Sequence, residues 1–290
     1  WLRKNSGFYS IKLHNCEFAV PFNFVATACW NLNNHVDRTV VNVAWTQDLI
    51  KICHDISPLI FCNVYIQYTI ATMLIIGHRG AAGLALENTL ESLQAGFDAG
   101  SDMLEFDVRL TSDKVPILAH DNMLRDQRIS TSTLAQLKAS GPVTTLTEIL
   151  DEFFGKILLN LEYKPVRGVD VVYRLIESRY VKNTDDWNNI LFSSFHVRPL
   201  LRLRNLSEHT NLALLHSVNP FSFVTYQRKL QLAAVGWHRL HVNRLAIEIA
   251  QQSDIFSYVY TVNRPKAAAI LERRGIDGVV TDYPNKLANN

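Results

Sequence analysis

From residue 73 onward, the sequence predicts an α/β protein with the (β/α)8 architecture of a small TIM barrel. Short apolar segments alternate with segments of helical spacing, and about eight such units follow one another. No glycine-rich dinucleotide-binding motif follows any of the apolar segments. Repeated β-then-α units favour parallel strands joined by helical crossovers. An open doubly wound sheet is the main alternative, and the missing motif weakens it.

The predicted strands are short apolar segments bounded by glycine or polar residues. They are Leu74–Gly77, Met103–Leu110, Val115–Ala119, Ile157–Tyr163, Ile190–Ser194, Leu212–Leu215, Arg239–Val242, Ser257–Thr261 and Gly278–Thr281. Apolar residues at helical spacing predict helices between most of these strands. The clearest are Thr89–Ala99, Leu146–Phe154, Val169–Ser178, Pro199–Leu206 and Pro265–Arg274.

Residues 1–72 differ in composition from the rest of the chain. They contain a single glycine, Gly7, and no methionine, while Met73 directly precedes the first predicted strand. We therefore interpret residues 73–290 as the folded domain and residues 1–72 as an atypical N-terminal extension. For this extension we consider a leader, a disordered segment or upstream translation. All of the cysteines lie within it, at Cys16, Cys29, Cys53 and Cys62.

The bulk composition narrows the class of function. The formal net charge is only +2, which argues against a nucleic-acid partner bound through bulk positive charge. A barrel region without cysteine and no visible secretory signal favour the cytoplasm. Residues 56–76 carry no charge and are long enough to raise a membrane span. Their polar residues and their overlap with the first strand make membrane association a minor alternative, so we expect no stable membrane insertion.

Polar side chains stand where the first predicted strands end, and in a TIM barrel these ends line the active site. Each short pattern alone more often marks a turn or a solvated strand face, but together and in order they favour a site. The set comprises two histidines, three carboxylates and two cations: His78, Arg79, Glu105, Asp107, His120, Glu162 and Lys164.

Strand alternation places Glu105 and Asp107 on one face of their strand, and Glu162 and Lys164 on one face of theirs. If both faces point into the barrel mouth, three carboxylates converge. Three hard oxygen ligands suit one divalent cation, Mg²⁺ or Ca²⁺, better than zinc or copper. We therefore predict a metal site formed by these three carboxylates.

Such a constellation suits hydrolysis of a phosphodiester. A divalent cation, together with Arg79 and Lys164, can neutralise the phosphoryl oxygens and the charge that develops in the transition state. His78 and His120 can exchange protons near neutral pH. One would take the proton of the attacking hydroxyl, and the other would protonate the leaving oxygen.

Ordered motifs along the chain resemble those of the glycerophosphodiester phosphodiesterases, a family of the phospholipase-C-like phosphodiesterase superfamily. The resemblance covers about residues 74–285 and excludes the first 72. Its motifs are His78-Arg79-Gly80, Glu87-Asn88-Thr89, Glu105-Phe106-Asp107-Val108, Thr111-Ser112-Asp113, His120-Asp121, Asn160-Leu161-Glu162-Tyr163-Lys164, Ser193-Ser194-Phe195 and residues 275–284.

This resemblance implies a small-molecule substrate such as glycerophosphocholine, cleaved to sn-glycerol 3-phosphate and an alcohol. In the route it implies, the glycerol 2-hydroxyl attacks phosphorus and water then opens the cyclic phosphate. Tyr260 stands where the family often has tryptophan and would floor the glycerol pocket. The other implied roles are His78 and His120 for acid/base catalysis, Glu105, Asp107 and Glu162 for the metal, and Arg79 and Lys164 for phosphate.

Two departures from the family pattern bear on substrate choice. Lys114 stands where a turn glycine is usual. The stretch between His120 and Glu162 is short, so Asn122–Ser140 has room for a loop and one helix. We therefore expect the cap over the substrate pocket to be reduced or absent.

Two other functions stay open at this point. A lysophospholipase D would use the same catalytic residues at the barrel mouth on lipid substrates. An exposed apolar lip near the mouth would favour this function. A non-catalytic phosphate-binding module would be favoured by loss of a histidine or carboxylate of the set, yet all are present.

Overall fold

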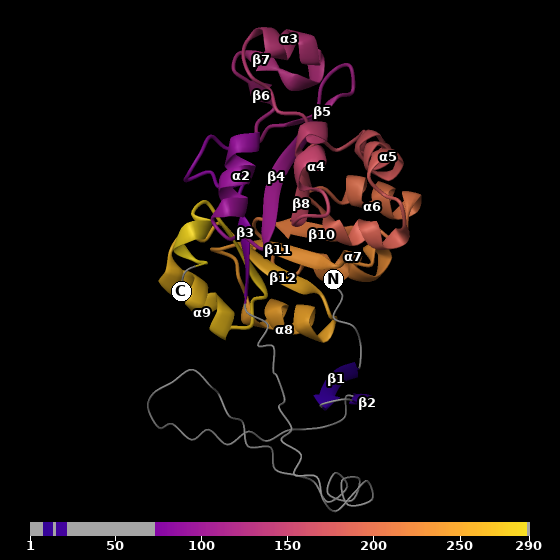
Figure 1. Ribbon diagram of the computed structural model, residues 1–290, viewed down its shortest axis with the longest axis vertical. Coiled ribbons are helices and arrows are strands. Elements are labelled where there is room, and N and C mark those ends of the chain that lie inside the picture. The colour runs from indigo at the N-terminus through magenta and orange to yellow at the C-terminus, as the bar shows by residue number, and fades with distance from the viewer. Residues whose placement is uncertain (1–7, 14–15, 22–72, 289–290) are drawn as a thin grey trace, which may run out of the picture. The chain divides into compact units, whose positions relative to one another are not determined.

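Eight parallel strands close into a barrel in the computed structural model, which describes residues 8–13, 16–21 and 73–288 (Figure 1). Pairing of the first barrel strand with the second completes the closure. The predicted (β/α)8 class is therefore confirmed. The strands are β3 (Leu74–Gly77), β4 (Met103–Leu110), β8 (Leu158–Tyr163), β9 (Ile190–Ser194), β10 (Asn211–His216), β11 (Ala234–His238), β12 (Phe256–Tyr260) and β13 (Gly278–Thr281).

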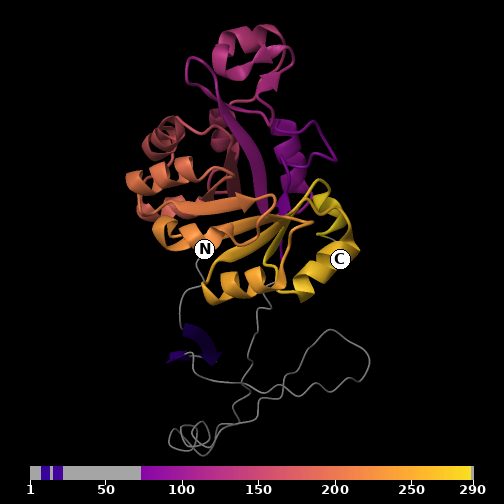
Figure 2. The same ribbon diagram turned by 180° about the vertical axis from the view of Figure 1, so that it is seen from behind.

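Helices between the strands cover the outside of the barrel, as the front and back views show (Figures 1 and 2). Side-chain caps fix where two of them begin, because Thr89 and Thr145 each accept a hydrogen bond from a backbone N–H of the first turn. The helices are α2 (Leu90–Asp98), α4 (Leu146–Phe153), α5 (Val169–Arg179), α6 (Val197–Leu206), α7 (Ser222–Leu230), α8 (Arg244–Gln252) and α9 (Pro265–Arg273). Short segments of 3-10 helix lie at Thr184–Asn189 and Pro284–Lys286.

Alternation along β4 divides its side chains between two environments. Phe106 and its outward neighbours pack against the helices, while Met103 packs inside the barrel. Glu105 and Asp107 share the inward face with Met103. Apolar side chains thus fill the lower barrel interior, and the carboxylates take the layers above them.

The predicted strand Arg239–Val242 is wrong. The strand in this part of the chain is β11, which ends at His238. Residues Arg239–Val242 lie in the loop after it, and Leu240 is largely exposed. The loop residues alternate between polar and apolar side chains, a pattern typical of a half-buried strand. Gly236 lies within β11, and a glycine lowers the strand propensity of its segment. A Cβ atom at Gly236 would lie 2.6 Å from the Leu215 side chain and 2.8 Å from that of Tyr258. Close packing inside the barrel therefore requires the glycine.

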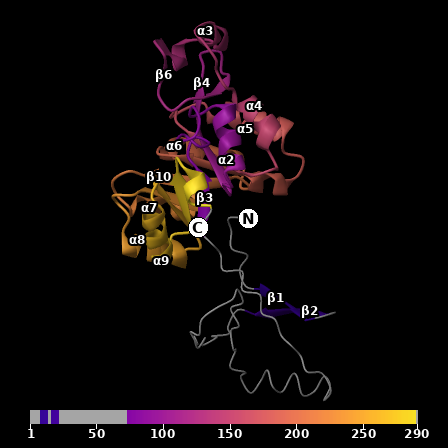
Figure 3. The same cartoon turned by 60° about the vertical axis from the view of Figure 1, so that its left-hand side comes forward.

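The predicted strand Val115–Ala119 is not part of the barrel wall. Residues Pro116–Leu118 form β5, which pairs antiparallel with β4 and belongs to an insertion between β4 and α4. The insertion stands beyond the barrel helices in Figures 1 and 3. Its other elements are the hairpin β6 (Met123–Leu124) and β7 (Gln127–Arg128), a 3-10 turn (Ile129–Thr131) and α3 (Leu134–Ala139).

This insertion holds more structure than the loop and single helix expected for Asn122–Ser140. Ile117, Ala119, Ile129 and Leu137 form a small apolar core of their own. Lys114 adopts a left-handed φ of 64° at its start, the conformation for which glycine is usual. The insertion is thus a compact unit with more structure than expected, while a reduced cap over the substrate pocket stays a prediction.

The N-terminal extension is described only at two strands, β1 (Phe8–Leu13) and β2 (Cys16–Pro21), which pair as an antiparallel hairpin. The hypotheses for residues 1–72, and most of the uncharged stretch 56–76, otherwise lie outside the described residues. Within the described residues, no helix has the length and apolar character needed to cross a membrane.

Candidate active site

Glu105, Asp107 and Glu162 converge at the mouth of the barrel, as the sequence predicted. Each offers one carboxylate oxygen to a group whose atoms all lie within 4.8 Å of one another. Strand register explains the convergence, because Asp107 on β4 stands opposite Glu162 on β8 in a parallel ladder. All three are at least nine-tenths buried, with exposed fractions of 4%, 1% and 9%.

Burial and the close approach of other charges shift the pKa values of these carboxyl groups. Burial, and next the Asp107 charge, raise the pKa of Glu105 to about 8 and also raise the pKa of Glu162. Burial acts on Asp107 too, but Lys164 and Asn88 outweigh it and hold the pKa of Asp107 below its usual range. Three buried oxygens competing for two neighbouring cations are a donor set that a divalent cation fits. These three residues would hold it.

Lys164 and Arg79 supply positive charge on two sides of the carboxylates. Lys164 Nζ lies 2.9 Å from Asp107 Oδ1 and 2.5 Å from Glu162 Oε1. Arg79 donates through Nη1 to both oxygens of Glu87, at 2.7 and 2.8 Å, and its Nε lies 3.3 Å from Asp107 Oδ2. Both predicted phosphate-binding cations therefore stand beside the predicted metal ligands.

Asn88 connects the loop after β3 to the carboxylate on β4. Its Nδ2 donates to Asp107 Oδ2 at 2.9 Å, and its Oδ1 accepts from the Asp107 backbone N–H at the same distance. The backbone N–H of Arg79 donates to Glu105 Oε2 at 2.8 Å. Asn88 and Arg79 both have left-handed φ values, 58° and 50°, so the loop is bent to bring these groups onto β4.

His78 is held by Asp282, which follows β13. The two groups are 2.5 Å apart, from Nδ1 to Oδ1, and Asn263 donates to the other Asp282 oxygen at 2.6 Å. Burial would lower the pKa of His78, but the hydrogen bond to Asp282 and the charge of Glu105 outweigh it and raise that pKa. Because an ionised carboxylate only accepts, Nδ1 carries a proton and Nε2 is left for proton exchange.

His120 follows β5, whose antiparallel course returns the chain to the carboxylates. The Ala119 N–H donates to the Asp107 carbonyl at 3.0 Å, and Arg109 donates to the His120 carbonyl at 3.0 and 2.7 Å. The imidazole Nδ1 lies 2.9 Å from Asp121 Oδ1. Burial, and then the charge of Lys164, lower the pKa of His120. The pKa values of the two histidines are thus shifted in opposite directions.

A cavity of about 300 Å³ opens at the mouth, and His120, Glu162, Lys164 and Phe195 line it together with Arg109, Asp121, Tyr163 and His196. Tyr260 lies beside this group, with its ring in edge contact with Phe195 at 5.9 Å between centroids. Its hydroxyl donates to the His216 carbonyl at 2.9 Å. Phe195 and Tyr260 therefore form an aromatic wall next to Lys164.

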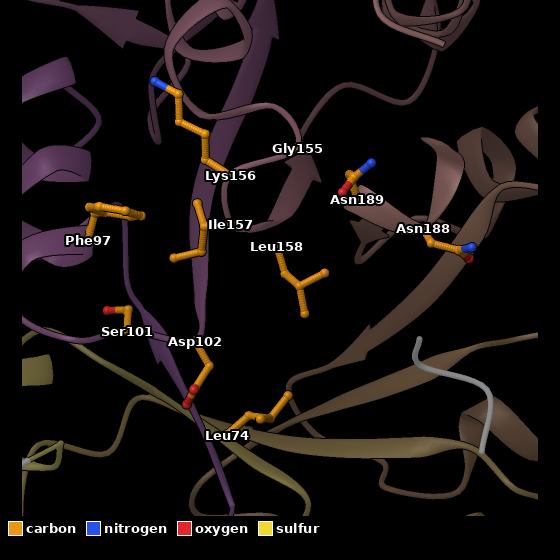
Figure 4. A pocket seen from close by; sticks show the side chains of 10 residues that line it. All are labelled: Leu74, Phe97, Ser101, Asp102, Gly155, Lys156, Ile157, Leu158, Asn188 and Asn189. Atoms are coloured by element: carbon orange, nitrogen blue, oxygen red, sulfur yellow. The ribbon is translucent and has the colours of Figure 1, made fainter. Parts of the chain in front are cut away.

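A larger cavity, of about 450 Å³, lies at the other end of the barrel (Figure 4). Leu74 and Leu158, at the first residues of β3 and β8, line it with Ile157. Its carboxylate, Asp102, accepts from the Ile75 N–H at 2.8 Å and so belongs to the backbone framework. Of the predicted site residues, His120, Glu162 and Lys164 line the smaller cavity, because the C-terminal strand ends lie there.

Sequence reasoning missed Asp282, Asn263 and Arg109. Asp282 directly follows the last strand, so the rule of polar strand ends, applied to all eight strands rather than the first few, would have found it. Asn263 could be found only by its place after β12. Arg109 acts on a backbone carbonyl of an antiparallel strand, and nothing in the sequence pattern indicates that contact.

Comparisons with known proteins show the family of the chain. The glycerophosphoryl diester phosphodiesterase family profile matches residues 78–286. The YhdW protein of Bacillus subtilis is 30% identical over 234 residues, which cover 73% of this chain and 96% of that protein. A glycerophosphodiester phosphodiesterase of Caldanaerobacter subterraneus is 26% identical over 242 residues, which cover 74% of this chain and 96% of that enzyme.

Solved structures show the same fold. A glycerophosphodiester phosphodiesterase from Thermotoga maritima superposes with a TM-score of 0.65 at 27% identity, covering 75% of this chain and 97% of that one. A phosphodiesterase of Oleispira antarctica, solved with the product sn-glycerol-3-phosphate, gives a TM-score of 0.66 at 24% identity and covers 74% of this chain and 95% of that one. The fold and the buried acidic cluster define a barrel hydrolase. The chain belongs to the glycerophosphoryl diester phosphodiesterase family.

Proposed function

We propose that the chain hydrolyses glycerophosphodiesters to sn-glycerol 3-phosphate and an alcohol in a reaction that depends on one divalent cation, Mg²⁺ or Ca²⁺. The convergence of three carboxylates within 4.8 Å, beside Lys164 and at the same barrel mouth as two histidines whose pKa values shift in opposite directions, carries this proposal. When bound, the cation neutralises phosphoryl oxygens and stabilises the charge of the transition state. The ligands in this proposal are Glu105, Asp107 and Glu162.

The opposite pKa shifts assign the proton transfers. His78, with its raised pKa, holds a proton more readily than His120, whose pKa is lowered, so His78 acts as the acid and His120 as the base in the first step. His120 takes the proton of the glycerol 2-hydroxyl as that oxygen bonds to phosphorus. The bond from phosphorus to the alcohol breaks, and His78 protonates the leaving oxygen.

Water completes the reaction with the roles exchanged. His78, now neutral, takes a proton from water as the water oxygen bonds to phosphorus and opens the cyclic phosphate. His120, now protonated, returns its proton to the glycerol 2-oxygen. Arg79 and Lys164 hold the phosphoryl oxygens throughout, and Tyr260 packs on the glycerol.

Histidine variants and a chelator test the proposal. His78→Ala and His120→Ala should each lower the turnover of glycerophosphocholine by about 10²–10⁴-fold, because each removes a proton-transfer group. EDTA should abolish the activity, and Mg²⁺ or Ca²⁺ should restore it. Turnover is followed by release of choline.

His209→Ala is the matched control, since His209 lies in an exposed loop at the other end of the barrel. It should match the wild type. Wild-type rates in either active-site variant would remove that histidine from the mechanism, and full activity in EDTA would refute the metal site.

A further inference from the structure

Exposed apolar side chains surround the barrel mouth. Loops that follow five of the barrel strands each carry at least one large apolar side chain exposed to solvent, and three helices expose one in their first turns. We call this set the apolar rim. Its loop members are Leu84, Leu86, Val166, Phe195, Val218 and Leu240, and its helix members are Leu90, Val224 and Leu245.

The apolar rim belongs to one end of the molecule. Parallel barrel strands all end at the same face, so the loops after them share that face. Among the described residues, the other exposed large apolar side chains are Phe97, Met123 and Ile270, and none lies in the loops at the opposite end. Scattered exposed apolar residues are ordinary, but a set confined to one face marks an interaction surface.

Three members reach furthest into solvent. The exposed fractions are 73% for Leu86, 70% for Val218 and 74% for Leu240, each in a different loop. Val218 and Leu240 follow the neighbouring strands β10 and β11, whereas Leu86 follows β3, three strands further round the barrel, so the three residues spread along the rim rather than forming one groove. An apolar layer that meets the whole mouth fits this arrangement better than a single peptide or helix.

Charge on the same loops favours an anionic partner. Arg167, Arg239 and Arg264 are exposed there. Carboxylates of the rim loops are engaged, since Glu87 binds Arg79 and Asp282 binds His78. Further exposed carboxylates lie in the insertion, at Asp113, Asp121 and Asp126. Two basic rims would repel each other, so a second copy of the chain fits less well than an anionic lipid surface.

We propose that the apolar rim docks the barrel mouth on an anionic phospholipid surface. Leucine and valine side chains enter the acyl boundary, and the arginines contact the phosphate groups. The contact is peripheral. It presents the active site to head groups at the interface, where a phosphodiester carrying a single acyl chain can enter. That last consequence rests on the proposed function, whereas docking does not.

Vesicle co-sedimentation of the full chain tests the docking. Wild-type protein should sediment with phosphatidylglycerol/phosphatidylcholine vesicles, and less with phosphatidylcholine alone. The triple variant Leu86→Ser, Val218→Ser, Leu240→Ser should bind about tenfold or more weakly, because three side chains leave the acyl region. Arg167→Gln with Arg264→Gln should weaken binding and reduce its dependence on salt.

Ile270→Ser is the control variant, because Ile270 is also a large, exposed apolar side chain but lies on α9 outside the apolar rim. It should bind like the wild type. The triple variant should still hydrolyse soluble glycerophosphocholine. Its loss of turnover on lysophosphatidylcholine mixed into the vesicles would tie docking to catalysis.

Absence of wild-type sedimentation, or equal sedimentation of the triple variant, overturns the docking. A concentration-dependent dimer in sedimentation velocity that the triple variant abolishes, without vesicle binding, overturns it in favour of self-association. Vesicle binding in a protein that cleaves no glycerophosphodiester would leave the docking intact and refute the proposed function instead.

Discussion

Asp107 shows how one buried side chain depends on its neighbours. It is almost fully buried. Asn88 donates a hydrogen bond to its carboxylate, and Lys164 and Arg79 form ion pairs with it. A buried carboxylate is tolerated only with such partners. Asp107 in turn holds Arg79 and Lys164, the proposed phosphate-binding cations, so the proposed substrate site and the proposed metal site form one electrostatic unit.

Asp282 sets the protonation of His78, which gives a prediction for pH. Asp282→Asn removes the negative charge that helps to raise the pKa of His78. Activity that needs protonated His78 is lost as the pH rises through that pKa. The alkaline limb of the kcat profile should therefore move to lower pH, with kcat reduced roughly tenfold or more.

The pH profile separates this positioning role from a structural one. Asp254→Asn, in a loop at the opposite end of the barrel, should leave both limbs unchanged. An alkaline limb that stays in place in Asp282→Asn would show that Asp282 does not control the charge of His78.

At the scale of elements, the antiparallel strand β5 determines where His120 lies. The sequence predicted the apolar segment and the histidine after it, but not that the segment runs antiparallel outside the barrel wall. Two hydrogen bonds from Arg109 to the His120 carbonyl hold the residue that follows β5, and the apolar pattern does not indicate them. Such long-range donation to a carbonyl leaves no local signal in the sequence.

Arg109→Ala should therefore weaken catalysis through His120. Without the guanidinium, the His120 carbonyl loses its two donors and the imidazole is less well placed. We expect kcat to fall by about 10–100-fold with KM and metal affinity nearly unchanged. Steady-state kinetics and calorimetric Mg²⁺ titration measure these quantities.

Arg109→Lys should restore part of the loss, because one donor returns. Arg125→Ala, which removes an arginine that contacts only the insertion around Ser140 and Pro142, should behave like the wild type. A rise in KM without a change in kcat would instead show that Arg109 binds the substrate directly.

The alternation of strands and helices made most of the barrel predictable. β3, β4, β9 and β13 have the predicted bounds. β11 was missed because interior packing selects glycine at Gly236, against the propensity of strands. Local patterns thus identified the elements, whereas their contacts across the barrel decided the exceptions.

Over the whole molecule, the parallel barrel gathers the ends of separate strands at one mouth. The proposed ligands for a cation come from β4 and β8, one histidine follows β3, and its carboxylate partner follows β13. Residues far apart in sequence meet only because the barrel closes between β3 and β13 on one side and β3 and β4 on the other. The barrel from residue 73 onward thus holds every residue of the proposed reaction.

Phosphorus NMR of glycerophosphocholine incubated with the purified full chain and Mg²⁺ or Ca²⁺ tests the central claim most directly. The spectrum distinguishes which phosphorus–oxygen bond breaks. The account predicts that sn-glycerol 3-phosphate replaces the diester signal, and that Glu162→Gln lowers the rate by about 10²-fold or more. Phosphocholine as the product, no turnover with either ion, or an unimpaired Glu162→Gln variant would contradict it.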